Sequence, residues 1–328
     1  MSTHPHHGVR SAPSTAECDA SIVVPVYGGA QTLPTLLERI ALMAAESKLG
    51  VEVLLICDRP RDNSWEVACA LVEQYPFARS ALLMRNFGQH PATLLGIRMA
   101  RGDIIVTMDE DLQHDPADIP SLVAAARAQR GIAYGKATTL QHSWWRNFSS
   151  RSAKWFLARY VGLDYASDLS AFRAFASELR DAFDQYRSER VAIDVLLSWS
   201  GAPIQIVPCQ HAARQEGHSG YTLRKLVAYL MDLLLGFSIA PLRLSSLIGL
   251  GAVALSISII LFVLLRWLIE GSTVPGFAFL ALSVSTFAGI QLLALGVIGE
   301  YLGRLYFNSL NRPQYLVQEI REHHPPSR

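Results

Sequence analysis

Residues 102–113 of the chain are Gly-Asp-Ile-Ile-Val-Thr-Met-Asp-Glu-Asp-Leu-Gln, a β-branched apolar run that stops on three acidic residues. Such a run predicts a buried strand of an α/β sheet. Asp109 and Asp111 would then lie at the carboxyl end of this strand, the edge where open α/β sheets bind ligands. Carboxylates gathered there repel one another unless a cation lies between them. The stretch therefore predicts a divalent metal next to a phosphate, and the alternative is an acidic turn without a ligand.

Strand and helix alternate on the N-terminal side of this motif. Apolar runs at residues 21–27, 51–58 and 81–84 predict strands, and the intervening patterns predict helices at residues 33–45, 65–74 and 88–100. After the motif, Pro116 and Pro120 bracket a further helix that ends near residue 129. This order predicts a doubly wound, Rossmann-like α/β domain with a mostly parallel sheet.

A glycine-rich phosphate loop is absent from the sequence. No G-x-G-x-x-G follows the first predicted strand, and no Walker A motif occurs. A nucleotide would therefore be held by side chains and a metal. Asp58 closes the second predicted strand, where its carboxylate could accept hydrogen bonds from a base or ribose. The alternative for Asp58 is an ordinary turn residue at a helix entry.

The C-terminal third of the chain contains two uncharged apolar stretches, residues 244–265 and 277–298. At ~1.5 Å per residue each can cross the ~30 Å hydrocarbon core of a bilayer as a helix. The short connection predicts a hairpin with both outer ends on one side of the membrane. Most nearby basic residues flank those outer ends, so the positive-inside rule places the large N-terminal region in the cytoplasm. These residues are Arg224, Lys225, Arg243, Arg304 and Arg312, against Arg266 near the turn.

The segment before the hairpin predicts a helix that lies in the membrane interface and ends at Pro241. A third spanning helix is the alternative, with Asp232 at a costly mid-membrane depth. We expect a disordered tail (1–19), a catalytic domain (20–220), an interfacial region (221–242), a hairpin (243–305, spans at about 244–266 and 277–299) and a cytoplasmic tail (306–328). The four scattered cysteines lack C-x-x-C spacing, which indicates a reducing compartment and no zinc site.

Two polar segments are candidates for binding phosphate. Residues 141–159 mix basic and aromatic side chains, among them Arg146 and Arg151, and suit an anionic lipid head group. An ordinary solvated amphipathic helix is the alternative. In residues 214–221, Arg214 and Ser219 could contact phosphate oxygens, or the segment could be a flexible connector. Nucleic acid is a poorer explanation because the formal charge is only +1 and the chain carries apolar spans.

These motifs, taken in order over residues 20–305, resemble the family 2 glycosyltransferases with a GT-A fold. More narrowly they are similar to the polyprenyl-phosphate glycosyltransferases, such as the undecaprenyl-phosphate aminoarabinose (formamidoarabinose) transferase type and dolichol-phosphate mannose synthase. The residues that carry the likeness are 22–27, Asp58 with 62–64, 85–90, 102–113, 173–175, 214–221 and 240–243.

The resemblance implies a set of site residues. Contacts to the nucleotide sugar would come from Pro25, Tyr27, Asp58, Gln89, Asp109 and Glu110. Asp109 and Asp111, with Gln113 nearby, would hold Mg²⁺ or Mn²⁺ against the donor diphosphate. The phosphate and acceptor contacts would come from Arg146, Arg151, Arg173, Arg214, Ser219 and Tyr221, with Asp109, Asp111 and Arg146 closest to the chemistry.

The resemblance also implies the reaction. A lipid phosphate is already ionised near neutral pH, so it can attack the anomeric carbon of a nucleotide sugar without a strong base, and the expected donor is a UDP-sugar. A metal and arginines supply positioning and charge neutralisation, and direct displacement would invert the anomeric configuration. The expected product is an undecaprenyl-phosphate sugar for modifying lipopolysaccharide or another envelope glycan. A homotetramer in the bacterial inner membrane is the expected assembly.

Four places depart from the family pattern, one of them Gly28-Gly29, which follows Tyr27 where Asn-Glu is common. Cys57-Asp58 stands where Asp-Asp is common, Gly220 occupies the usual place of a lysine, and Ala171 that of an aspartate. Two alternatives to the transferase remain. A processive polysaccharide synthase would carry a Gln-x-x-Arg-Trp motif and more spans, neither of which is present. A non-catalytic protein that binds a lipid-linked sugar or recruits a partner would keep its function when Asp111 is changed.

Overall fold

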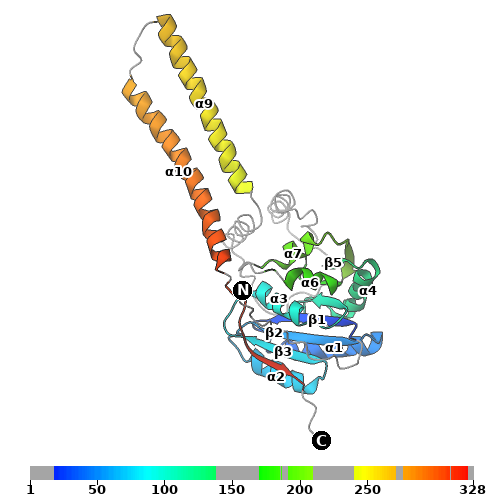
Figure 1. Ribbon diagram of the computed structural model, residues 1–328. Helices are drawn as coiled ribbons and strands as arrows, with labels where there is room; N and C mark the ends of the chain where they lie inside the picture. Colours follow the sequence, from blue (N-terminus) through cyan, green and yellow to red (C-terminus); the bar gives the residue numbers. More distant parts are fainter. Residues whose placement is uncertain are drawn as a thin grey trace, which may run out of the picture.

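The chain forms an α/β domain followed by two long helices (Figure 1). A computed structural model describes residues 18–137, 170–184, 186, 191–209, 240–270, 276–310 and 312–323. The strands are β1 (Ala20–Val26), β2 (Val51–Cys57), β3 (Ala78–Leu83), β4 (Ile104–Thr107), β5 (Ile132–Ala137), β6 (Arg173–Ala176), β7 (Ile204–Cys209) and β8 (Val317–Glu322). The helices are α1 (Leu33–Ser47), α2 (Ser64–Gln74), α3 (Gln89–Met99), a 3₁₀ turn η1 (Pro116–Asp118), α4 (Ile119–Gln129), α6 (Glu178–Asp184), α7 (Ile193–Trp199), α9 (Ala240–Glu270) and α10 (Gly276–Ser309).

All eight described strands belong to one mixed sheet with the order β7-β5-β6-β4-β1-β2-β3-β8. β1 pairs in parallel with β2 on one side and with β4 on the other, and β2 pairs in parallel with β3. The chain therefore reverses its direction of winding between β1 and β4. That reversal opens a crevice at the carboxyl ends of these two strands, the usual ligand site of such sheets. The predicted doubly wound fold is confirmed.

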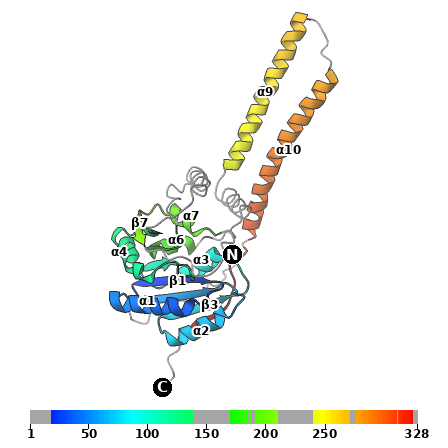
Figure 2. The same cartoon turned by 180° about the vertical axis from the view of Figure 1, so that it is seen from behind.

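Helices cover both faces of the sheet (Figures 1 and 2). One buried cluster joins α1, α2 and α4 to one face through residues such as Leu37, Leu71 and Leu122. A second cluster joins α3, α6 and α7 to the other face through residues such as Leu94, Phe183 and Leu196. Strands buried on both faces are expected to be nearly continuous apolar runs, which is the pattern that predicted β1, β2 and β4.

Helix α3 packs directly against β1 and β2 at Gly96. A Cβ at this position would approach Cγ1 of Val23 in β1 to 2.2 Å. Glycine permits this close contact between helix and strand. The approach brings the first residue of α3, Gln89, beside the crevice at the end of β1.

The predicted elements are present with small shifts in their ends. β3 begins at Ala78, three residues before its predicted start, because Arg79 is a strand residue whose guanidinium pairs with Glu52 of β2. The helix predicted between Pro116 and residue 129 is a 3₁₀ turn followed by α4. Asp62 accepts hydrogen bonds from the backbone N–H and the hydroxyl of Ser64, the first residue of α2, while Asn63 at the N-cap makes no side-chain capping hydrogen bond.

The C-terminal segment differs from the expected tail. β8 pairs antiparallel with β3 and extends the sheet at its edge. Glu322 on β8 forms ion pairs with Arg79 and Arg101. An alternating strand of charged residues was not predicted, because an edge strand buries only one side and its partner is far away in the sequence. The chain thus returns from α10 to the α/β domain.

Helices α9 and α10 are long and apolar enough to cross a membrane, over Leu242–Arg266 and Thr286–Ser309. They lie side by side and project from the α/β domain, with their outer ends, at Ala240 and Ser309, on the domain side (Figures 1 and 2). Apolar side chains such as Leu250 and Leu292 are exposed along them. Large exposed apolar surfaces of this kind mark contact with lipid or with another protein.

Candidate active site

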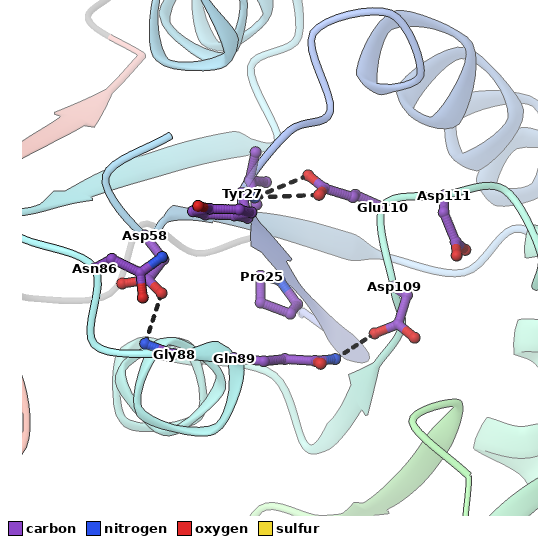
Figure 3. A pocket seen from close by; sticks show the side chains of 10 residues that line it. Pro25, Tyr27, Asp58, Asn86, Gly88, Gln89, Asp109, Glu110 and Asp111 are labelled. Atoms are coloured by element: carbon purple, nitrogen blue, oxygen red, sulfur yellow. Dashed lines mark hydrogen bonds between the residues drawn. The ribbon is translucent and has the colours of Figure 1, made fainter. Parts of the chain in front are cut away.

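A pocket of about 320 Å³ lies at the carboxyl ends of β1, β2 and β4 (Figure 3). Its lining residues come from the ends of these strands and from the start of α3: Pro25, Val26, Tyr27, Asp58, Asn86, Gly88, Gln89, Asp109, Glu110 and Asp111. We call it the donor pocket. The structure therefore brings together seven of the predicted site residues, which are Pro25, Tyr27, Asp58, Gln89, Asp109, Glu110 and Asp111.

Asp58 organises the wall of the donor pocket. Its two carboxylate oxygens accept hydrogen bonds from the backbone N–H groups of Phe87 and Gly88, each at 2.7 Å. The residue is only 3% exposed, and this burial raises the pKa of its carboxyl group above the ordinary value, although the two N–H donors act in the opposite direction. Asp58 therefore fixes the loop before α3. The next residue, Arg59, has a left-handed backbone (φ 48°), a strained state for a residue with a side chain.

Glu110 fixes the opposite wall. Its carboxylate accepts hydrogen bonds from the backbone N–H groups of Tyr27, at 3.1 Å, and Gly28, at 3.0 Å. Burial raises the pKa of the Glu110 carboxyl group, against the effect of these two donors. A Cβ on Gly29 would lie 2.4 Å from Oε2 of Glu110, so a side chain at this position would displace the carboxylate from the loop. The loop after β1 and the loop after β4 are thereby joined.

Asp109 and Asp111 follow β4 and point toward the donor pocket (Figure 3). Nε2 of Gln89 donates a hydrogen bond to Oδ1 of Asp109 at 2.6 Å. The backbone N–H of Gln113 donates to Oδ1 of Asp111 at 3.2 Å. Between Asp111 and Gln113, Leu112 adopts a left-handed backbone (φ 59°). Strain of this kind, of order 1–3 kcal/mol, concentrates at functional sites.

The two aspartates suit a hard divalent cation. Mg²⁺ is commonly held by one or two carboxylates together with substrate phosphates, and carboxylate oxygens also suit Mn²⁺. Across the described ranges, no group of three or more His, Cys, Asp or Glu side chains is arranged to hold a metal. A cation at Asp109 and Asp111 would therefore take its other ligands from water and from the bound diphosphate. This arrangement would link the metal to the presence of the donor.

A second polar pocket, of about 220 Å³, adjoins the donor pocket. The two pockets share Gln89 and Asp109. The other lining residues of the second pocket are His90, Thr93, Ser170, Ala171, Arg173 and Asp194. Asp194 lies in the first turn of α7, so this pocket combines residues from α3, from the end of β4, from the start of β6 and from α7.

Arg173 is held inside a buried network. Its guanidinium pairs with Asp194, and its Nε donates a hydrogen bond to the hydroxyl of Thr107 at 3.0 Å. The hydroxyl of Tyr134 donates to the same oxygen of Asp194 at 3.0 Å. Arg173 is 4% exposed and Tyr134 is fully buried. The predicted acceptor ligand Arg173 therefore has a carboxylate partner already, and its charge is compensated within the protein.

The remaining predicted residues lie elsewhere. Gln113 is beside Asp111 but does not line either pocket. The predicted phosphate ligands at positions 146, 151, 214, 219 and 221 lie outside the described residues, as do the predicted interfacial helix and the N-terminal tail. Sequence analysis assigned no role to His90 or Asp194. Asp194 is the only acidic residue in the apolar run of α7, and that contrast was the available sign.

Acidic residues after β4, in the crevice of an open α/β sheet, are the arrangement of an enzyme site that binds its ligand through a metal ion. A family model described as glycosyl transferase family 2 matches residues 21–187. The chain belongs to this family and is a glycosyltransferase.

Two curated relatives illustrate the likeness over nearly the whole chain. The undecaprenyl-phosphate 4-deoxy-4-formamido-L-arabinose transferase of Serratia proteamaculans is 32% identical over 304 residues, covering 92% of this chain and 93% of the relative. The protein of the same name from Proteus mirabilis is 33% identical over 306 residues, with the same coverage. These alignments include the region of α9 and α10.

A solved structure shows the same fold. Glucosyl-3-phosphoglycerate synthase from Mycobacterium tuberculosis, in complex with Mn²⁺, UDP and glucosyl-3-phosphoglycerate, matches with a TM-score of 0.50 and 17% identity. The match covers 66% of this chain and 77% of that protein. The predicted membership of a GT-A family 2 glycosyltransferase is confirmed.

Proposed function

We propose that this protein transfers a single sugar from a UDP-sugar to undecaprenyl phosphate with the help of Mg²⁺ or Mn²⁺. One observation carries the proposal. The same chain has the donor pocket and two apolar helices, and it aligns over nearly its whole length with transferases named for undecaprenyl phosphate. An isoprenoid acceptor requires an enzyme that meets the lipid surface. The two apolar helices leave the α/β domain and supply that contact.

The donor would lie with its diphosphate at Asp109 and Asp111. A divalent cation bound there would neutralise charge on the departing UDP. Gln89 keeps Asp109 in place through its 2.6 Å hydrogen bond, and Glu110 holds the loop that carries Tyr27. Tyr27 is 44% exposed and lines the donor pocket, where its ring can stack against a base. These residues position the donor and take no proton from it.

The reaction is a direct displacement. A phosphate oxygen of the acceptor attacks the anomeric carbon, the bond from this carbon to the β-phosphate oxygen breaks, and UDP leaves with the electron pair. The acceptor phosphate is already ionised, so proximity and alignment supply most of the rate. In-line attack inverts the anomeric configuration, and NMR of the product would test that. Arg146, Arg151, Arg214, Ser219 and Tyr221 are the proposed contacts to the acceptor and donor phosphates.

The proposed location is the bacterial inner membrane, with the α/β domain in the cytoplasm. The basic residues Arg243, Arg304 and Arg312 near the outer ends of α9 and α10 support this orientation. We further propose a homotetramer and a product used for envelope glycan modification. Accessibility of single cysteines to a membrane-impermeant reagent in intact cells would test the orientation, and mass measurement in detergent would test the assembly.

The test of function uses the full chain in detergent with undecaprenyl phosphate, Mg²⁺ or Mn²⁺, and a panel of UDP- and GDP-sugars. Mass spectrometry should detect a lipid-monophosphate sugar from a UDP donor, and EDTA should abolish it. We expect Asp111→Asn to lower the rate by at least about 10²-fold, as expected when charge stabilisation is lost. Asp103→Asn, the same change at the opposite end of β4, should leave it unchanged. A product that forms equally well in EDTA would refute metal dependence, and full activity of Asp111→Asn would refute the assigned site.

A further inference from the structure

The volume of the second pocket suits one group of a ligand, such as a sugar or a phosphate, and is too small for a whole nucleotide sugar. Sites for whole drug-sized ligands or cofactors occupy roughly 300–1,000 Å³, and the second pocket has about 220 Å³. It shares Gln89 and Asp109 with the donor pocket, so its occupant lies next to the group bound there. If the diphosphate lies at Asp109, as the proposed function requires, two groups can be the neighbour. They are the sugar of the donor and the phosphate head of the acceptor.

The charges in the second pocket favour an uncharged occupant. Asp194 compensates the guanidinium of Arg173 by direct pairing. Asp109, which also lines the donor pocket, faces the proposed cation. Burial, reinforced by the nearby charge of Arg173, lowers the pKa of His90, which favours the neutral imidazole. Among the described residues that line this pocket, no uncompensated positive charge remains for a phosphate. An anion placed here would lose its hydration without gaining a counter-charge.

The polar atoms of the second pocket suit hydroxyl groups. The hydrogen bonds that Arg173 and Tyr134 donate to Asp194 both go to its Oδ1. In the described part of the chain no hydrogen bond is directed at Oδ2, and the side chain of Asp194 remains 22% exposed. The hydroxyl of Thr93 and the imidazole of His90 add groups that donate or accept. A pyranose carries hydroxyls that match such a mixed set.

We infer that the second pocket binds the sugar of the nucleotide donor, and that the Arg173–Asp194 pair selects an uncharged sugar against an acidic one. This inference rests on the proposed function for the position of the diphosphate. Asp194 is the specificity-determining residue, because it both accepts a hydrogen bond from a sugar hydroxyl and repels a sugar carboxylate. Arg173 and Tyr134 are positioning residues that hold Asp194 in place.

The test compares UDP-xylose with UDP-glucuronic acid, which differ only by the carboxylate on the sugar ring. Binding to the full chain in detergent with Mn²⁺ is measured by competition against a fluorescent UDP. The wild-type protein should bind UDP-xylose at least about tenfold more tightly than UDP-glucuronic acid, the ratio expected from one unfavourable charge contact of about 1.4 kcal/mol. Equal affinities in the wild type would overturn the inference without need of any variant.

Asp194→Asn supplies the second measurement. It removes the negative charge and leaves the charge of Arg173 uncompensated, so the preference for UDP-xylose should fall about tenfold while binding of UDP is unchanged. Asp103→Asn, the same change at an exposed aspartate before β4, is the matched remote control and should keep the preference. If Asp194→Asn instead leaves the preference intact and lowers the KM for the lipid phosphate, the pocket belongs to the acceptor and the inference is wrong.

These binding measurements need no acceptor. A failure of transfer to undecaprenyl phosphate would count against the proposed function, whereas equal affinities of the wild-type protein for the two UDP-sugars would count against the sugar pocket. The two failures are therefore distinguishable.

Discussion

Asp58→Asn separates two roles of an aspartate in the donor pocket. In the resemblance to family 2 enzymes, this residue contacts the nucleotide. In the structure, its carboxylate oxygens accept hydrogen bonds from the N–H groups of Phe87 and Gly88, both at 2.7 Å. Asparagine has nearly the same shape but presents an NH₂ group in place of one oxygen. The backbone N–H of Phe87 or Gly88 would then face this NH₂ group, which is also a donor. The conflict would be buried, because Asp58 is only 3% exposed.

The size of the effect follows from these contacts. A hydrogen bond to a charged group contributes about 1.5–3 kcal/mol, and a buried donor left unsatisfied costs about 1–3 kcal/mol. Burial raises the pKa of Asp58, so part of this is offset by the cost of keeping its charge buried. We expect a net loss of about 3 kcal/mol, which corresponds to a decrease in Tm of roughly 6–12 °C for a domain of this size.

The assay is thermal unfolding of the full chain in detergent, followed by tryptophan fluorescence, with and without UDP. Asp103→Asn, an exposed aspartate before β4, is the matched control and should unfold like the wild type. UDP binding is measured in parallel against GDP and CDP. An unchanged Tm with an altered preference among the bases would refute the role of Asp58 as a loop holder, and would show that it reads the base.

Three further predictions concern packing, reactivity and the C-terminal strand. Gly96→Ala should lower the Tm by several degrees, because overpacking against Val23 costs about 1–3 kcal/mol, whereas Gly249→Ala, in open space on α9, should not. Burial raises the pKa of the Cys18 thiol to about 11. Its alkylation rate should therefore be negligible at neutral pH and should rise with pH up to about that value. Rapid alkylation of Cys18 at pH 7 would contradict this burial. Arg98→Met should remove the hydrogen bonds from α3 to Gln314 and Tyr315, in the segment before β8. Limited proteolysis should then release the C-terminal strand faster than in the wild type. An unchanged cleavage rate would show that the pairing of β8 with β3 is enough to hold this strand.

The fold was largely predictable because its central strands are buried on both faces. β1, β2 and β4 are mainly apolar, and residues that line the donor pocket follow each of them: Tyr27, Asp58 and Asp109. The prediction missed β8, whose alternating charged residues resemble an exposed tail until its partner β3 is known. It also placed the start of β3 too late, because the ion pair of Arg79 with Glu52 joins strands that are distant in the sequence.

The sequence predicted which residues form the candidate site better than it predicted the contacts between them. The sequence indicated Asp109 and Asp111, but not that Gln89 bonds to Asp109 or that Glu110 holds the loop after β1. These contacts join segments that are separated along the chain. Their distances depend on the close approach of α3 to the sheet, which no local pattern reports.

The amino-acid sequence by itself determined the alternation of strands and helices, the acidic end of β4 and the two apolar helices, since each depends on side-chain periodicity within one segment. The tertiary structure alone decided that Arg173 is compensated by Asp194, and that these residues share a pocket with His90. Pairing of charges across β6 and α7 depends on how the sheet and its helices pack. A local sequence pattern shows which residues are polar, whereas tertiary packing determines which polar residues contact one another.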